Sequence, residues 1–177
     1  MTKKSGFIES KIRIAVLVSG GGTNLQALID AQKSGAIKSA KIVAVISNNR
    51  DAYALERAET AGIKNFIVPK SGENAETEIL HILDTEKIDL IVLAGFMMIL
   101  SEKFTSRYAH RIINVHPSLI PSFCGKGFYG LRVHEAALEY GVKLTGATVH
   151  FVNEIPSCMS GGHRCWPSRW ATKWTGS

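Results

Sequence analysis

Residues 19–24, which read SGGGTN, are of types that could bind an anion, and they stand between an apolar run and a helical pattern. Glycines let a backbone approach a ligand closely, and N–H groups at the start of a helix are unpaired, so this loop suits a small phosphate monoester. Leu25 replaces the third glycine of a dinucleotide fingerprint, and no Gly-Lys-Ser/Thr follows as in a Walker A loop. A tight turn in which Thr23 is an ordinary N-cap is the alternative interpretation.

An amide and an imidazole stand close together in a second segment, residues 114–119, which reads NVHPSL. Asn114 and His116 are two positions apart, so on an extended backbone their side chains point the same way. An amide donor beside an imidazole could bind a developing oxyanion and transfer a proton. The same residues could instead close a strand end by hydrogen bonds to loop backbone, and the residues alone leave both interpretations open.

A third segment, residues 93–100, is almost entirely apolar and reads LAGFMMIL. An apolar loop at the end of a strand can form one wall of a pocket for a flat heteroaromatic ring. Methionine and phenylalanine are also ordinary core residues, and this interpretation remains open as well.

Strand and helix patterns alternate along the chain. Short apolar runs predict buried strands, and a longer alternating run predicts one more: 13–18, 41–46, 66–68, 90–94, 111–115 and 143–152. Amphipathic stretches predict helices at 25–34, 52–61, 75–87 and 133–140. Strands separated by helices of about ten residues imply an α/β fold with a mainly parallel sheet. Ligands gather at the carboxyl ends of such strands, here residues 19–24, 47–50, 95–100 and 114–121.

The chain has 177 residues and a formal net charge of +6, and its length suits one domain. No apolar run approaches the roughly 20 residues that cross a bilayer, and the basic start leads into a strand, so we expect a cytoplasmic protein with no membrane partner. The modest positive charge suits a phosphorylated substrate and does not indicate a nucleic-acid partner. The odd number of cysteines, three, argues against a disulfide framework.

Five segments taken together resemble one family. They are SGGGTNLQALID, SNNRDAYALERAETAGI, IDLIVLAGFMMIL, INVHPSLIPSF and TGATVHFVNEIP. In order and spacing they are similar to the glycinamide ribonucleotide formyltransferases of de novo purine synthesis, over residues 12–156. The HPSLIP motif is shared with other 10-formyltetrahydrofolate enzymes, whereas the SGGGTNL loop favours the glycinamide ribonucleotide branch. The resemblance implies a Rossmann-like formyltransferase fold, with a mainly parallel twisted sheet flanked by helices.

The resemblance also implies two substrates and the residues that bind them. The phosphate of glycinamide ribonucleotide would bind to Gly22, Thr23 and Asn24. The co-substrate would be 10-formyltetrahydrofolate, with its pterin ring in a folate-binding pocket. The folate-binding residues would be Met97, Met98, Ile99, Leu100 and Asn114.

Two residues carry the implied chemistry, in which the amine attacks the formyl carbon directly and tetrahydrofolate leaves. Asn114 would donate a hydrogen bond to the formyl oxygen as it becomes an oxyanion, and His116 would transfer the proton near the formyl carbon. No metal and no covalent enzyme intermediate are implied. Losing either side chain would be severe for turnover, since an oxyanion donor contributes about 10²- to 10³-fold and acid–base catalysis about 10²- to 10⁴-fold.

The last part of the chain departs from the family pattern. The family has an aspartate there that is the catalytic partner of the histidine, and Ser157 stands in its place. All three tryptophans also lie in the last twelve residues. We therefore expect a formyltransferase domain over 1–156, a fold truncated at its C-terminus, and an aberrant or disordered tail over 157–177. A shifted reading frame or natural divergence would explain such a tail.

These departures leave three functions open. The first is formyl transfer, with impaired activity, and the second is hydrolysis of 10-formyltetrahydrofolate by water. The third is a catalytically inactive remnant that binds folate and phosphate. Cys158, His163 and Cys165 match no standard zinc spacing, so we expect no metal site. We also expect marginal stability, because apolar surface that the missing elements normally cover would be exposed.

Overall fold

A six-stranded sheet forms the centre of the molecule, which the computed structural model describes over residues 11–152 except 126 and 129. The strands lie in the order β3-β2-β1-β4-β5-β6. Strands β1 to β5 are parallel to one another, and β6 is antiparallel to β5. Their bounds are β1 Ile12–Val18, β2 Ala40–Ser47, β3 Lys64–Ile67, β4 Leu90–Leu93, β5 Ile112–His116 and β6 Thr148–Phe151. The mainly parallel sheet expected from the sequence is confirmed.

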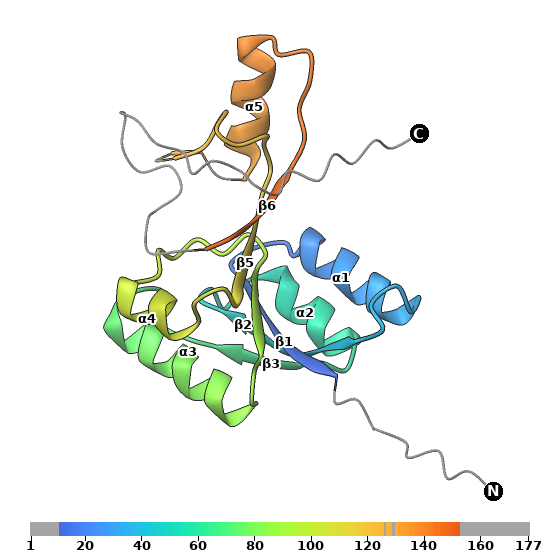
Figure 1. Cartoon of the computed structure of the whole chain (residues 1–177), viewed down its shortest axis with the longest axis vertical. Coiled ribbons are helices and arrows are strands. Elements are labelled where there is room, and N and C mark those ends of the chain that lie inside the picture. The colour runs from blue at the N-terminus through green and yellow to red at the C-terminus, as the bar shows by residue number, and fades with distance from the viewer. Residues whose placement is uncertain (1–10, 126, 129, 153–177) are drawn as a thin grey trace, which may run out of the picture.

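Helices flank the sheet (Figure 1). They are α1 Thr23–Lys33, α2 Tyr53–Thr60, α3 Glu73–Thr85, α4 Glu102–Arg107 and α5 Leu131–Tyr140. From β1 the chain moves outward through β2 to β3, and it then returns past β1 to β4. Because such crossovers are right-handed, this reversal places α1 and α2 on one face and α3 on the other. The reversal lies between β1 and β4, the position at which open α/β sheets bind ligands.

Two apolar clusters lie between the sheet and these helices. Val16 of β1 packs in one cluster with Leu25 of α1. The next residue of the strand, Leu17, packs in the other cluster with Ile79 of α3 and Phe104 of α4. Alternate residues of β1 thus supply both clusters, which explains the continuous apolar run in the sequence.

The sequence patterns did not predict α4, whose six residues are too few to show a helical period. Ser101 caps this helix, because its Oγ accepts a hydrogen bond of 3.2 Å from the N–H of Phe104. Phe104 is fully buried. Tertiary packing therefore stabilises a helix too short to be stable by itself.

β6 is shorter than the strand predicted over 143–152. Its partner β5 ends at His116, which pairs with Thr148. Within the described range, the residues before Thr148 therefore have no strand beside them to continue the ladder.

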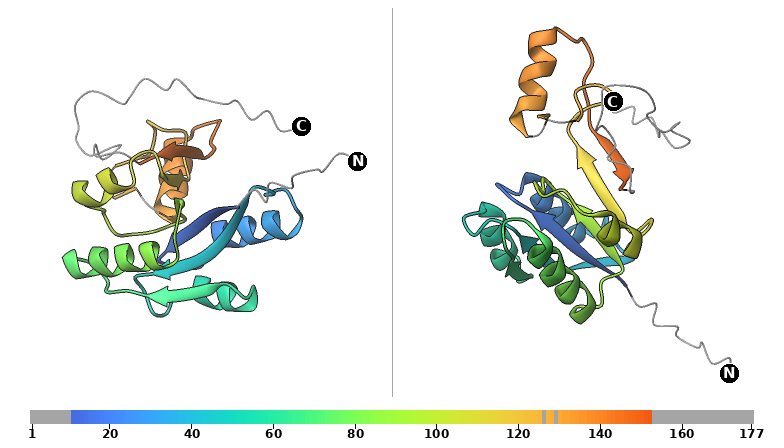
Figure 2. Two further views of the ribbon diagram at one scale, coloured as in Figure 1. Left: turned by 60° about the horizontal axis from the view of Figure 1, so that its bottom comes forward. Right: turned by 90° about the vertical axis from the view of Figure 1, so that its left-hand side faces the viewer.

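α5 stands away from the other helices in Figure 1 and in the right-hand view of Figure 2. Large apolar side chains are exposed on α5, on β6 and between them: Leu131, Leu138, Tyr140, Leu144, Val149 and Phe151. The expectation of marginal stability was based on exposed apolar surface of this kind. The stability itself stays a prediction.

The domain boundary after residue 156 and the tail over 157–177 fall outside the described residues, so both stay predictions. In the part of the chain that the structure describes, no helix has the length and apolar character needed to cross a membrane.

Candidate active site

The glycine turn, residues 19–22, connects the end of β1 to the start of α1. Gly22 is the N-cap of α1 and has φ 71° and ψ 32°, in the left-handed region that favours glycine. A Cβ on Gly22 would lie 2.7 Å from the Cβ of Ala54 on α2. Both the backbone conformation and the close approach of α2 therefore require glycine here.

The start of α1 carries no side-chain cap. Thr23 is the first helical residue and the N-cap is Gly22, so the alternative in which Thr23 is the N-cap is wrong. Thr23 and Asn24 are both exposed. The N–H groups of the first turn are thus available to solvent or to an anion. The assignment of Gly22, Thr23 and Asn24 to a substrate phosphate is compatible with this geometry and stays a prediction.

Ser19 ties the glycine turn to two other loops at the carboxyl edge of the sheet. Its Oγ donates a hydrogen bond of 2.6 Å to Oδ1 of Asn48, which follows β2. The same Oγ accepts one of 2.8 Å from the N–H of Met97, which follows β4. Asn48 is buried, and its Nδ2 donates to the carbonyl oxygen of Lys70. One polar chain therefore fixes the loops after β1, β2 and β4 relative to one another.

Residues 95–100, after β4, divide into two sets. Met98 and Leu100 pack against the cluster on the α3 face, which is the core interpretation of these residues. Met97 and Ile99 are 53% and 69% exposed. An apolar ligand at this edge would therefore meet Met97 and Ile99 first, and the folate-binding assignment of the four residues stays a prediction.

Asn114 and His116 lie at the carboxyl end of β5, both half-buried. Alternation along the strand places them on the same face as Ile112, which packs toward α3. The Nε2 of His116 lies 3.0 Å from the carbonyl oxygen of Phe123. A carbonyl only accepts, so Nε2–H donates, and Nδ1 is then the ring nitrogen that can accept a proton.

His150 of β6 is a further candidate site residue, which the sequence patterns did not indicate. Its Nε2 lies 3.1 Å from Nδ2 of Asn114, and the two residues are paired in the β5–β6 ladder. Its Nδ1 lies 3.2 Å from the carbonyl oxygen of Phe151. The ring therefore carries its proton on Nδ1, and Nε2 accepts from the Asn114 amide. In the sequence, Thr148 and His150 are two positions apart, which places both side chains on one face of a strand. That spacing indicates a role at the site only when the pairing with β5 is known.

Burial lowers the pKa of His150 from its ordinary value of 6.5. The bond to the Phe151 carbonyl opposes this shift, and the nearby His116 adds to it by charge repulsion. The neutral form is therefore favoured at neutral pH, and only that form can accept a hydrogen bond at Nε2.

Thr148 holds the loop that follows His116. Its Oγ1 donates a hydrogen bond of 2.6 Å to the carbonyl oxygen of Ser118 and accepts one of 3.0 Å from the N–H of Ile120. This loop continues to Phe123, whose carbonyl orients His116. β6 thus supports both polar side chains of β5, through His150 and through Thr148.

The glycine turn follows β1, and Asn114 and His116 lie on β5. Both lie at the carboxyl edge of the sheet, and β4 separates the two strands. Leu17 pairs with Leu93, and Leu93 pairs with Asn114. Neighbouring strands are about 4.8 Å apart, so this row spans about 10 Å. Hydrogen bonds of the described residues join the glycine turn to Met97, and none joins it directly to Asn114 or His116.

No cluster of three or more potential metal ligands occurs within residues 11–152, positions 126 and 129 aside. Ser157, Cys158, His163 and Cys165 all fall outside the described part.

Comparison with known proteins identifies relatives of this chain. The family model described as formyl transferase matches residues 12–155. The chain is similar to the phosphoribosylglycinamide formyltransferases of Haemophilus influenzae (49% identical over 146 residues, 80% of this chain) and Escherichia coli (46% over 147 residues, 81%). It spans 66% of the length of each. A crystal structure of phosphoribosylglycinamide formyltransferase from Anaplasma phagocytophilum matches with a TM-score of 0.73 and 42% identity, over 82% of this chain and 67% of that one. The chain belongs to the formyl transferase family.

Proposed function

We propose that this chain transfers a formyl group from 10-formyltetrahydrofolate to the amine of glycinamide ribonucleotide, a step of de novo purine synthesis. The observation that carries the proposal is the Asn114 amide, held by His150 at the carboxyl end of β5 and two residues from His116. The names of the relatives, which cover about four fifths of this chain, support the choice of substrate. We also infer a cytoplasmic location, as expected from the sequence.

Asn114 has the chemistry of an oxyanion donor. One Nδ2 hydrogen is donated to His150, which fixes the amide plane and leaves the second hydrogen for the formyl oxygen. As the amine nitrogen bonds to the formyl carbon, negative charge grows on that oxygen. A donor already oriented toward this charge stabilises the transition state without reorganising.

His116 has the chemistry of a proton carrier. Its Nε2–H is bound to the Phe123 carbonyl, so Nδ1 would accept the proton that the attacking amine loses. The same proton would pass to the folate nitrogen as its bond to the formyl carbon breaks. Atoms and charge then balance with the formamide and tetrahydrofolate as products.

The substrates would be held on either side of these groups. The uncapped start of α1, at Gly22, Thr23 and Asn24, suits the phosphate of the amine substrate. Residues 97–100 would contact the pterin ring, through Met97 and Ile99 and through loop backbone. Met98 packs on the core, so its side chain is not needed for this contact.

The strength of catalysis depends on what replaces the missing carboxylate. A neutral Ser157 cannot stabilise an imidazolium as an aspartate does, so we expect turnover below that of a chain with the full set. Hydrolysis of the folate by water and binding without turnover are the competing outcomes. Reading the encoding DNA in the other frames after residue 156 would show whether an aspartate followed by glycines is hidden there.

The test is tetrahydrofolate release from 10-formyltetrahydrofolate, with and without glycinamide ribonucleotide. Release that requires the amine supports formyl transfer. Release without the amine supports hydrolysis, and binding without any release supports an inactive remnant. Asn65→Ala, at an exposed position of β3, provides a matched control for Asn114→Ala.

A further inference from the structure

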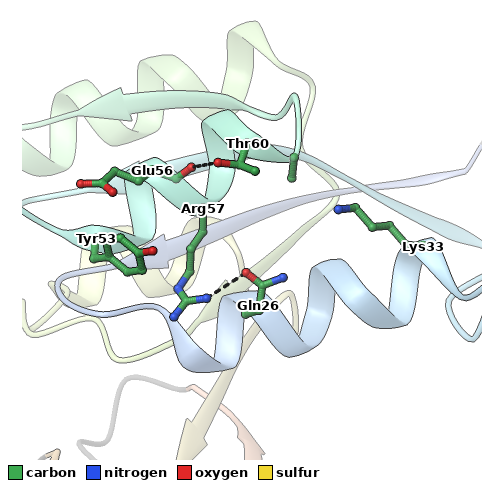
Figure 3. A pocket seen from close by; sticks show the side chains of 7 residues that line it. Gln26, Lys33, Tyr53, Glu56, Arg57 and Thr60 are labelled. Carbon is green, nitrogen blue, oxygen red and sulfur yellow. Dashed lines mark hydrogen bonds between the residues drawn. The ribbon is translucent and has the colours of Figure 1, made fainter.

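Arg57 of α2 makes three contacts beside the glycine turn. Its Nε donates a hydrogen bond of 2.9 Å to the carbonyl oxygen of Gly21. Its Nη1 donates one of 2.9 Å to Oε1 of Gln26 on α1, and its guanidinium carbon lies 4.8 Å from the centre of the Tyr53 ring (Figure 3). A planar guanidinium can make these contacts together because its donors point in fixed directions.

A second bond from α2 fixes the neighbouring peptide. The N–H of Ala54 donates a hydrogen bond of 3.1 Å to the carbonyl oxygen of Gly20. The carbonyls of Gly20 and Gly21 therefore both point toward α2. In a trans peptide the N–H points opposite to the C=O, so the N–H groups of Gly21 and Gly22 point away from α2.

These two N–H groups add to the uncapped N–H groups at the start of α1. Successive backbone N–H groups around a left-handed residue, here Gly22, form a concave anion site, and the helix contributes partial positive charge. Arg57 turns Nε and Nη1 toward Gly21 and Gln26. Through its bond to the Gly21 carbonyl, Arg57 can orient the Gly22 N–H without itself contacting an anion.

Packing alone does not hold Arg57 in this direction. A cavity of about 160 Å³ opens beside it, between α1 and α2, and Lys33, Glu56 and Thr60 also line this space. Arg57 is only partly buried. Its two hydrogen bonds and the Tyr53 ring therefore set its orientation.

We propose that Arg57 is a positioning residue for phosphate binding, which holds the Gly21 carbonyl toward α2 so that the Gly22 N–H faces the phosphate. This inference rests on the proposed function, which puts the substrate phosphate at the glycine turn. It adds a residue from a second helix, 35 positions after Gly22 in the sequence, to the determinants of that site.

The experiment titrates inorganic phosphate into the full chain and follows the backbone amide signals of residues 21–24 by ¹⁵N NMR. Arg57→Lys keeps the positive charge and removes the fork that reaches two oxygens at once. We expect phosphate to bind about 3- to 10-fold more weakly, the effect of about one lost hydrogen bond. We also expect the Gly21 and Gly22 signals to move before any phosphate is added, because the Gly21 carbonyl loses its guanidinium donor.

Two further variants complete the design. Lys33→Met removes an exposed positive charge from the same cavity without contacting the turn, and we expect its phosphate affinity to stay within about 2-fold of the unsubstituted chain. Gln26→Met removes the oxygen that accepts the hydrogen bond from Nη1 of Arg57. We expect phosphate binding to weaken less than in Arg57→Lys, and the Gly22 signal to shift. Thermal unfolding checks that each variant is folded. If Arg57→Lys does not fold, the phosphate affinity of Gln26→Met tests the inference instead.

The possible results distinguish a failure of the Arg57 inference from a failure of the proposed function. Equal phosphate affinity in Arg57→Lys and the unsubstituted chain would refute positioning and leave the proposed function intact. An equal loss in Lys33→Met would also refute it, because charge alone would then explain the effect. If phosphate moves no signal at residues 21–24 of the unsubstituted chain, the proposed phosphate site and this inference both fail.

Discussion

The Oγ of Ser19 accepts a hydrogen bond of 2.8 Å from the backbone N–H of Met97, a residue 78 positions later in the chain. The same hydroxyl donates a bond of 2.6 Å to Asn48. One side chain thus joins the glycine turn to residues 95–100, the segments assigned to the two substrates. The relative position of those substrates would therefore depend on this hydroxyl.

Ser19→Ala should lower the free energy of unfolding by about 1–3 kcal/mol, because the Met97 N–H and the buried Asn48 amide oxygen would each lose a partner. Urea unfolding measures this change. Ser34→Ala is the control, since the Ser34 hydroxyl makes an exposed hydrogen bond to the carbonyl of Ala31, and we expect it to stay within about 0.5 kcal/mol. Equal losses of unfolding free energy in the two variants would show that the hydrogen bonds of Ser19 contribute no more to stability than the exposed bond of Ser34.

Asn114→Ala should reduce turnover by about 10²- to 10³-fold, and His116→Ala by about 10²- to 10⁴-fold, because one removes the proposed oxyanion donor and the other the proposed proton carrier. Both side chains are half-buried, so melting temperatures should change little. Tetrahydrofolate release in single-turnover mixtures is the measurement. His81→Ala, at an exposed position of α3, is the control for His116. Turnover that survives either substitution at the site would contradict the assigned chemistry.

The free energy of unfolding should fall as the pH drops below 6.5, through the contribution of His150. Its pKa in the folded chain is lower than the ordinary 6.5, chiefly because of burial. Between the two pKa values the unfolded chain binds the proton and the folded chain does not, so acid favours unfolding. The loss begins near 6.5 and is complete below the folded pKa.

Thermal unfolding of the unsubstituted chain and of His150→Gln, compared across this pH range, isolates the contribution. Glutamine can still accept from Asn114 and does not titrate, so the pH dependence should be shallower in the variant. An NMR titration of the His150 ring gives its pKa directly. A value at or above 6.5 would remove the basis of this prediction.

Gly22→Ala should destabilise the chain strongly, whereas Gly21→Ala should not. Position 22 has φ 71°, which costs a residue with a side chain about 1–2 kcal/mol, and the added Cβ would lie 2.7 Å from Ala54. A Cβ on Gly21 would have nothing within 4 Å. Urea unfolding gives both values, and phosphate titration should show weaker binding for Gly22→Ala. Similar stabilities in the two variants would be inconsistent with the described turn.

Two apolar residues on α5 should behave in opposite ways. Val133 is 1% exposed and Leu138 is 81% exposed. Val133→Ala removes buried methyl groups and should cost about 2 kcal/mol of unfolding free energy. Leu138→Ala should stay within about 0.5 kcal/mol and should reduce binding of a hydrophobic dye, because it trims exposed apolar surface. A larger loss for Leu138→Ala would mean that this side of α5 is covered in solution.

The sequence by itself determined the class of fold and the position of the segments that could carry chemistry, among them the glycine turn and the Asn114–His116 pair. Continuous apolar runs such as 13–18 specify strands buried on both faces, and their alternation with helices specifies a parallel sheet. The two-residue spacing of Asn114 and His116 puts their side chains on one face, because the period of a strand is local. The glycine turn was visible for a similar reason, since glycine is the residue type that readily permits the left-handed conformation found at Gly22.

Only the tertiary structure decided which distant residues meet these segments. His150 supports Asn114 through the register of an antiparallel pair, and no local pattern records which residue of one strand lies opposite which residue of another. Ser19 reaches Met97 because β1 and β4 become neighbours when the chain reverses direction across the sheet. Arg57 reaches Gly21 because α1 and α2 lie on the same face. Such contacts depend on strand order and register, which are set by packing of the whole domain and not by any short stretch of sequence.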